Sequence, residues 1–396
     1  MRKIYSTFLA CAVTTTLAAP GIAQERPLGS SDGLSDAFRS SVAASSQAPG
    51  SSAIALDGLL SSLGLVGSSD FDIPEMALEL DDNFPYPIDE TITEAKLLNR
   101  EVSPTGNVAA NAERRLERWT VSSPSMGRDI TVDVRLPGGA DAPIVVLLDG
   151  VSAPINSGWL YGPGKEEIEE VFGDEHATLV FPVDANGTWY SDWIEDDPVL
   201  GRHKWETFIV EELLPLVEAE PDTFFNGHRA IGGLSMGASG AVHLANSHPE
   251  LFDATFGFSG CYSTSSRVGE QIVRLVTETR GGTVENMWGP VGSEEWDRHD
   301  VSAHPEGLRD MAVYLSAADG GIDELPSEED RSNDSLIIGA ALENGVYTCT
   351  RELDRAMRAE GMDHHVVNYK GDGVHDWRNF EEELAPAWEH IRPSLY

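Results

Sequence analysis

A short segment near the middle of the chain combines the residue types that a nucleophilic serine needs. Residues 233–237 read Gly-Leu-Ser-Met-Gly, a G-x-S-x-G pattern centred on Ser235. Residues 228–231 before it predict a short buried strand, and residues 241–246 after it predict an apolar-periodic helix. Between a strand and a helix, small neighbouring residues allow a sharp turn that projects the serine hydroxyl outward. The segment therefore predicts a nucleophile at Ser235; the alternative is a Gly/Ser-rich turn without chemistry.

A serine hydroxyl becomes a good nucleophile only when a base takes its proton and an acid orients that base. In hydrolases whose serine lies in a turn between a strand and a helix, the three catalytic residues occur along the chain in the order serine, acid, histidine. His375 lies in a Gly-rich loop after the last predicted strand, so we predict it to be the base. Two residues are candidates for the acid: Asp319, just after a predicted strand, and Glu343, further on in a helical pattern. Spacing alone favours Asp319.

Two backbone N–H groups are needed to stabilise the oxyanion that forms when a serine attacks an ester. The first is predicted at Met236, directly after the nucleophile. The second is predicted at Val151, in the turn that follows an earlier strand; an ordinary strand-ending turn is the alternative. The sequence has no H-E-x-x-H, C-x-x-C, P-loop or dinucleotide-binding pattern, so we predict no metal and no cofactor.

Positioning these groups requires strands that end at one edge of a sheet. Alternating polarity predicts a half-solvated strand, and continuous apolar runs predict strands that are covered on both faces. The predicted strands span residues 128–136, 143–148, 178–183, 254–260, 311–315 and 365–369, and further helices span 205–220 and 377–391. Alternating strands and helices predict an α/β-hydrolase fold, a doubly wound and mostly parallel sheet flanked by helices.

The composition and the first residues indicate an exported protein. The chain has 396 residues, with 66 acidic against 27 basic side chains and a net charge of -39, which argues against nucleic acid as a partner. A basic start, an apolar run over residues 8–19 and small residues before Gln24 predict a signal peptide over 1–23. Residues 24–112, rich in Ser, Gly, Ala and acidic residues, predict a flexible extension with one short helix at 54–66; the two alternatives for this segment are a passive linker and a segment that binds a partner. Residues 113–396 form the predicted catalytic domain of a secreted or cell-envelope monomer.

Two cysteines remain once the predicted leader is removed, Cys261 and Cys349. A cysteine pair in an exported protein is more often bridged than free, because its compartment is oxidising. Neither residue lies on a nucleophile motif. We therefore predict a disulfide between Cys261 and Cys349.

Several short motifs resemble the mycolyltransferases, that is, the antigen 85 family and its corynebacterial relatives. They occur in consistent order over residues 116–392: SPSMGRDI at 123–130, LLDG at 147–150, WYSDW at 189–193, KWETF at 204–208, GLSM at 233–236, MWGP at 287–290 and HDW at 375–377. In that family the acid is a glutamate within a Leu-Glu-Asn-x-Val helix, and residues 342–346 match this motif. The resemblance therefore moves the predicted acid from Asp319 to Glu343.

The resemblance implies acyl transfer through an acyl-serine, from trehalose monomycolate (or its corynomycolate counterpart) to a second trehalose monomycolate or to arabinogalactan. Asp149, Trp377 and the Met236 amide match positions that surround trehalose in the family. Ser152 stands where the family often has arginine, which removes a cationic donor to sugar hydroxyls. Trp189 and Trp193 are candidates either for sugar stacking or for core packing.

Two other functions compete with this interpretation. A secreted carboxylesterase of the same fold would use the same serine, histidine and acid, with water as the acyl acceptor. A non-catalytic relative would bind carbohydrate or host matrix instead.

Overall fold

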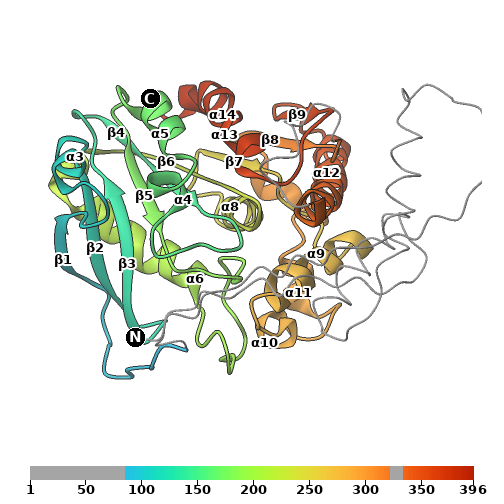
Figure 1. Ribbon diagram of the computed structural model, residues 1–396, viewed down its shortest axis with the longest axis horizontal. Coiled ribbons are helices and arrows are strands. Elements are labelled where there is room, and N and C mark those ends of the chain that lie inside the picture. Colours follow the sequence, from blue (N-terminus) through green and yellow to red (C-terminus); the bar gives the residue numbers. More distant parts are fainter. Residues whose placement is uncertain (1–84, 322–332) are drawn as a thin grey trace, which may run out of the picture.

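The computed structural model describes residues 85–321 and 333–396, so the predicted signal peptide and the helix predicted at 54–66 lie outside the described residues. One nine-stranded sheet runs through this part of the chain, in the order β1-β2-β3-β5-β4-β6-β7-β8-β9 (Figure 1). Strands β4 to β9 pair in parallel with their neighbours, whereas β1, β2 and β3 form an antiparallel edge that joins the sheet at β5. This arrangement confirms the predicted mostly parallel, doubly wound sheet.

The bounds of the strands are β1 (Lys96–Val102), β2 (Leu116–Ser123), β3 (Arg128–Arg135), β4 (Ala142–Leu148), β5 (Thr178–Pro182), β6 (Phe225–Leu234), β7 (Ala254–Phe258), β8 (Ala312–Ala318) and β9 (Val366–Lys370). The bounds of the helices are α3 (Val108–Glu113), α4 (Gly158–Tyr161), α5 (Lys165–Phe172), α6 (Trp205–Thr207), η1 (Phe208–Leu213), α7 (Leu214–Ala219), η2 (Pro221–Thr223), α8 (Met236–Ser247), α9 (Arg267–Glu278), α10 (Val284–Trp288), α11 (Glu294–Arg298), η3 (Pro305–Leu308), α12 (Asn333–Ala359), α13 (Trp377–Glu381), α14 (Leu384–Ile391) and η4 (Arg392–Ser394).

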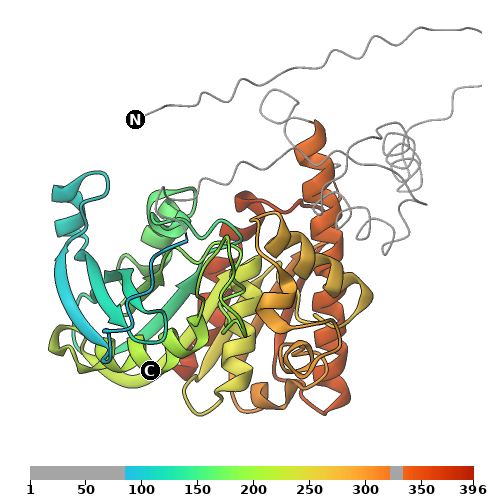
Figure 2. The ribbon, with the colours of Figure 1, turned by 90° about the horizontal axis from the view of Figure 1, so that it is seen from below.

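The continuous apolar run of β4 is explained by a core on each face of the sheet. Successive side chains of a strand point to opposite faces. Accordingly, Ile144 and Val146 pack in the cluster that includes α8, α9, α12 and η1, while Val145 and Leu147 pack in the cluster that includes α4, α5 and α14. Seen from below, the blue strand β1 and the orange-red helix α12 lie at opposite ends of the sheet (Figure 2).

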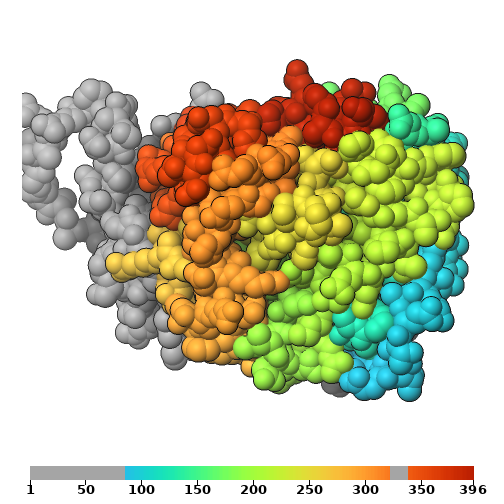
Figure 3. All heavy atoms as spheres, turned by 180° about the vertical axis from the view of Figure 1, so that it is seen from behind, coloured from blue at the N-terminus to red at the C-terminus, as the bar shows by residue number. Residues whose placement is uncertain are grey.

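The reverse side of the molecule is covered mainly by the middle of the chain. In Figure 3 the yellow-green to orange segments form most of this surface, and the red C-terminal helices lie along its top. None of the helices in the described residues is long and apolar enough to cross a membrane.

The sheet begins earlier in the chain than the predicted boundary at residue 112. Strand β1 and all but the last residue of helix α3 fall within the predicted extension 24–112, and β1 pairs with β2 along its length. The residues before β1 also contact the domain. The guanidinium of Arg128 lies 4.4 Å from the centre of the Tyr86 ring, and the Asp89 N–H donates to the Gly127 carbonyl at 2.7 Å.

Two helices differ from the prediction in continuity. The helix predicted over 205–220 consists of α6, the π-helical segment η1 and α7, with Pro215 in the first turn of α7. Proline lacks an N–H and cannot continue the ordinary ladder, so the hydrogen-bond register changes before it. The helix predicted over 377–391 is divided into α13 and α14.

A disulfide joins Cys261, which follows β7, to Cys349 in α12. It spans a sequence separation of 88 residues. The bond therefore ties the carboxyl end of a central strand to the long helix that carries Glu343.

Candidate active site

Ser235 occupies a sharp turn between β6 and α8. Its backbone has φ 55° and ψ -125°, a conformation that L-residues rarely adopt and that is typical of strained functional positions. A Cβ on Gly233 would lie 2.6 Å from the carbonyl carbon of Gly237, and a Cβ on Gly237 would lie 2.4 Å from the Asp149 carbonyl oxygen. Glycine is therefore required on both sides of the serine, as the G-x-S-x-G pattern predicts.

Ser235, His375 and Glu343 form one chain of hydrogen bonds. Nε2 of His375 lies 2.7 Å from Oγ of Ser235, and Nδ1 lies 2.8 Å from Oε2 of Glu343. The loop after β9 is held in place by a hydrogen bond from the His375 N–H to the Gly339 carbonyl at 3.1 Å. In this geometry the carboxylate fixes a proton on Nδ1, which leaves Nε2 free to accept the serine proton.

The carboxylate of Glu343 is fully buried and has several donors. Its second oxygen, Oε1, accepts hydrogen bonds from Ser259 Oγ at 2.7 Å, the Ala318 N–H at 2.8 Å and Asn379 Nδ2 at 2.9 Å. Buried polar groups need partners of this kind. Ser259 and Asn379 belong to no sequence motif, so their role beside Glu343 is not predictable from the sequence.

Asp319, which spacing alone favoured as the acid, lies in the turn after β8. Its Oδ1 accepts the Gly321 N–H at 2.7 Å, and its carbonyl accepts Asn344 Nδ2 at 2.8 Å. The residue that the structure brings to Nδ1 of His375 is Glu343.

The backbone segments that carry the two predicted oxyanion donors lie on either side of Ser235. Met236 is the first residue of α8, where backbone N–H groups have no acceptor within the helix. On the other side, a Cβ on Gly150 would lie 3.3 Å from Cβ of Ser235, so the turn at 149–151 packs directly against the serine. The Gly187 N–H holds this turn through the Val151 carbonyl at 3.0 Å.

A pocket of about 770 Å³ opens in front of Ser235 and His375. Its walls include all three residues that the sequence analysis placed at the substrate, Asp149, Ser152 and Trp377. Residues from the loops after β4, β6 and β9 thus meet in one pocket at the carboxyl ends of these strands, as expected for this class of sheet.

Asp149 is a buried carboxyl group in the wall of this pocket. Its Oδ1 accepts the Gly158 N–H at 3.0 Å, whereas Oδ2 is buried without a hydrogen-bond partner among the described residues. Burial raises the pKa of Asp149 to about 7.

Trp377 forms a half-buried wall beside the histidine. Its ring meets that of Trp159 edge-on, with centroids 5.3 Å apart. A Cβ on Gly158 would lie 2.3 Å from Cζ2 of Trp377, so this glycine makes room for the ring. In contrast, Trp189 and Trp193 are only 3% and 1% exposed and belong to the core. Of the two roles considered for them, sugar stacking and core packing, the structure therefore favours core packing.

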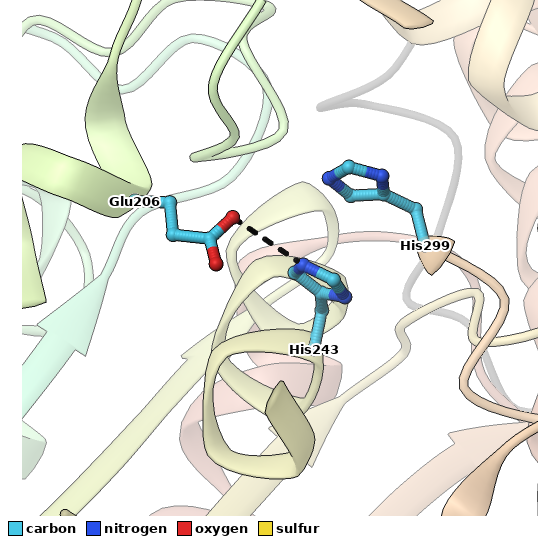
Figure 4. Close-up of side chains that lie close together, drawn as sticks. All are labelled: Glu206, His243 and His299. Carbon is cyan, nitrogen blue, oxygen red and sulfur yellow. Dashed lines mark ion pairs between the residues drawn. The ribbon is translucent and has the colours of Figure 1, made fainter. Parts of the chain in front are cut away.

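A second group of ionisable side chains lies away from the pocket. Glu206, His243 and His299 are buried, with one donor atom of each within 4.8 Å of the others (Figure 4). His243 Nε2 lies 3.7 Å from Glu206 Oε2. However, Oε1 already bonds His248 Nε2 at 2.9 Å, and Oε2 accepts Nη2 of Arg298 at 2.5 Å.

These contacts indicate an internal ion network rather than a metal site. The rings of His243 and His299 are stacked, 4.2 Å apart with planes 22° from parallel, so their in-plane lone pairs do not converge on one point. The positive charge of Arg298 would also oppose a bound cation. Burial lowers the pKa of His243 and of His299, which therefore pack as neutral rings beside the Glu206–Arg298 pair.

Several known proteins are similar to this chain in sequence or in fold. Residues 123–391 match the esterase family, described as "Putative esterase". The chain is 32% identical over 289 residues to the diacylglycerol acyltransferase/mycolyltransferase Ag85A of Mycobacterium tuberculosis (strain ATCC 25618 / H37Rv), covering 71% of this chain and 81% of that protein. It is 30% identical over 312 residues to the protein of the same name from Mycobacterium leprae (strain TN), covering 76% and 89%.

Two solved structures show the same fold. MPT51 (FbpC1) of Mycobacterium tuberculosis has a TM-score of 0.58 and 24% identity, covering 70% of this chain and 97% of that chain. An S-formylglutathione hydrolase from Agrobacterium tumefaciens has a TM-score of 0.50 and 15% identity, covering 76% and 98%. The predicted α/β-hydrolase fold is thereby confirmed. Because the family match covers most of the chain and the identity extends over most of both Ag85A proteins, the chain belongs to the esterase family and, within it, to the antigen 85 mycolyltransferases.

Proposed function

We propose that this protein is an exported acyltransferase that moves a mycolyl or corynomycolyl group from trehalose monomycolate to a second trehalose monomycolate or to cell-wall arabinogalactan. The observation that carries the proposal is the hydrogen-bond chain from Ser235 through His375 to Glu343, which opens into the pocket lined by Asp149 and Trp377. The names of the Ag85A relatives support the acyl group, and the predicted leader supports export.

The first half-reaction forms an ester on the serine. His375 Nε2 takes the proton of Ser235 Oγ as this oxygen bonds to the carbonyl carbon of the donor ester. The Met236 and Val151 N–H groups stabilise the oxyanion that develops on the carbonyl oxygen. The carbon–oxygen bond to trehalose then breaks, trehalose leaves with the proton from His375, and the acyl group remains on Ser235.

The second half-reaction uses an alcohol in place of the departed trehalose. The acceptor hydroxyl gives its proton to His375 while its oxygen attacks the acyl carbon, and Ser235 regains a proton as it leaves. A sugar that is bound beside the acyl group competes with water because it is present at high effective concentration. Asp149 and the Trp377 ring, which line the pocket, are the groups that would hold this sugar.

A carboxylesterase remains the second candidate, because the matched family is an esterase family and the same three residues serve hydrolysis. The test is product analysis of the purified protein with trehalose monomycolate, with Ser235→Ala as the control. Trehalose dimycolate and free trehalose are expected from the wild type and neither from the variant. Free mycolic acid without dimycolate would instead identify a hydrolase. A wild-type protein that a serine-directed phosphonate does not label would indicate a non-catalytic binding protein.

A further inference from the structure

Arg280 is a buried cation close to the pocket. The residue is 5% exposed, and its Nε has no hydrogen-bond partner among the described residues. Within residues 85–321 and 333–396 no carboxylate forms an ion pair with it, and burial alone lowers the pKa of its guanidinium. An unpaired buried charge is costly, so a chain that keeps one is expected to use it.

The stem of Arg280 is fixed against the turn that supports the oxyanion loop. Arg280 follows helix α9 and packs on Gly187, where an added Cβ would lie 2.9 Å from both Cβ and Cγ of the arginine. The N–H of Gly187 in turn donates to the carbonyl of Val151 at 3.0 Å. The guanidinium is therefore held at a defined position behind the loop at residues 149–153.

The head of Arg280 meets Ser152. Nη2 donates a hydrogen bond to Ser152 Oγ at 3.3 Å, across a sequence separation of 128 residues. Ser152 is exposed and lines the pocket together with Ser235 and His375. A guanidinium has only donors, so Ser152 acts as the acceptor in this contact and its own proton stays available. That proton can then be donated into the pocket.

The acidic group of Asp149, which lies in the same pocket, indicates which class of ligand the Ser152 hydroxyl would bind. A negatively charged ligand would be disfavoured beside this acidic group, and the whole chain has a net charge of -39. A neutral polyol offers both kinds of group: hydroxyl protons for Asp149 and hydroxyl oxygens for Ser152.

We infer that Arg280 is a positioning residue that orients the Ser152 hydroxyl as a hydrogen-bond donor to the neutral, polyhydroxylated acyl acceptor. The inference rests on the proposed function, because it requires an alcohol that binds next to acyl-Ser235. Ser152 stands where the family often has arginine. Arg280, which comes from a distant segment, places a guanidinium next to this serine instead.

The test separates the two half-reactions of the purified enzyme. With p-nitrophenyl butyrate as the donor, the nitrophenolate burst measures acylation of Ser235, and the yield of butyryl-trehalose at increasing trehalose concentration measures acceptor binding. Arg280→Met is expected to raise the half-saturating trehalose concentration about tenfold, the usual effect of one lost charge-assisted hydrogen bond, with a much smaller effect on the burst. Ser152→Ala is expected to do the same.

The double variant and a matched control sharpen the result. If Arg280 acts through Ser152, Arg280→Met has no further effect on trehalose saturation in a Ser152→Ala background. Arg274→Met, in the helix that precedes Arg280, is the control, because the Arg274 guanidinium pairs with Glu270 and Glu278, and its trehalose saturation should match the wild type.

Three outcomes would overturn the inference. One is trehalose saturation in Ser152→Ala within about twofold of the wild type, a readout that does not depend on whether Arg280→Met folds. Another is a double variant in which the effects of Ser152→Ala and Arg280→Met on the half-saturating trehalose concentration multiply. The third is an equal loss of burst and transfer, which indicates a merely structural arginine. A wild-type enzyme that cleaves the ester without any trehalose-dependent product would overturn the proposed function itself.

Discussion

Glu343 Oε2 lies 2.8 Å from His375 Nδ1, while Oε1 of the same carboxylate accepts three hydrogen bonds from other parts of the domain. Both oxygens are therefore fixed by the protein. A carboxylate held in this way sets the orientation and the tautomer of the imidazole, which is the role of the acid in serine hydrolases.

Replacing Glu343 by Gln should lower kcat for ester cleavage by on the order of 10³–10⁴-fold, because the amide no longer fixes the proton on Nδ1. Asp319→Asn is the matched control and should keep near-wild-type turnover, since its side chain caps the turn at Gly321. Burst kinetics with a p-nitrophenyl ester measure both variants. An inactive Asp319→Asn beside an active Glu343→Gln would reverse the assignment of the acid.

Asp149 makes stability depend on pH in a defined direction. Its pKa in the folded protein is about 7, above the usual value near 4 of an aspartate in the unfolded chain. The folded state therefore keeps a proton that the unfolded state has lost, and the free energy of unfolding falls as the pH rises from about 4 to about 7. Asp149→Asn removes this contribution.

Urea unfolding of the wild type and of Asp149→Asn at pH 5 and pH 8 measures the effect. Between these two pH values the wild type should lose on the order of 3 kcal/mol more than the variant. Parallel pH dependences of the two proteins would contradict the raised pKa of Asp149.

The disulfide between Cys261 and Cys349 closes a long loop across the core. Its removal should lower the free energy of unfolding by about 2–5 kcal/mol. Reduction should also slow ester cleavage, because Cys349 lies on α12, the helix that positions Glu343. Thermal unfolding with and without dithiothreitol measures this change. The variant with both Cys261→Ala and Cys349→Ala should no longer respond to the reductant, and a wild type that is equally indifferent would contradict the prediction.

The ion network at Glu206 predicts a structural role. Glu206→Gln removes the charge that faces Arg298 and His248 and should lower the free energy of unfolding by about 1–3 kcal/mol, because the Arg298 side chain is 39% exposed and water compensates part of the loss. Glu211→Gln, an exposed change in the neighbouring segment η1, is the control and should be nearly neutral. Denaturant unfolding of both variants tests this prediction. Added Zn²⁺ should leave the denaturant midpoint of wild-type unfolding unchanged. A midpoint that rises with the Zn²⁺ concentration and then saturates would favour a metal site instead.

Much of the fold can be predicted from local patterns, because the central strands are covered on both faces and their apolar runs are unmistakable. The edge is different: in β1 two of seven residues are half-buried and the others are exposed, so no alternation marks a strand. The same limit applies to the site. Ser235 and His375 follow from motif and chain order, but Glu343 lies 25 residues beyond the strand whose end it approaches, within a long helix, and only the family motif indicates it.

Arg280 shows a further limit of sequence reasoning. Its contact with Ser152 joins two segments that share no motif and are separated by 128 positions. The sequence shows only that position 152 is a serine, where the family often has arginine. The guanidinium of Arg280 reaches Ser152 because the end of α9 packs against the turn at Gly187. Such packing cannot be predicted from residue types.

The contact between Tyr86 and Arg128 has a consequence for the whole molecule. Arg128 begins β3, which runs antiparallel to β5 with Val132 opposite Pro182, the last residue of β5. The start of β3 therefore lies at the rim where the parallel strands end, on the same side of the sheet as the pocket. Any part of the chain before residue 85 is attached at this rim. The first residues that the structure describes therefore lie on the pocket side of the sheet and not at its opposite edge.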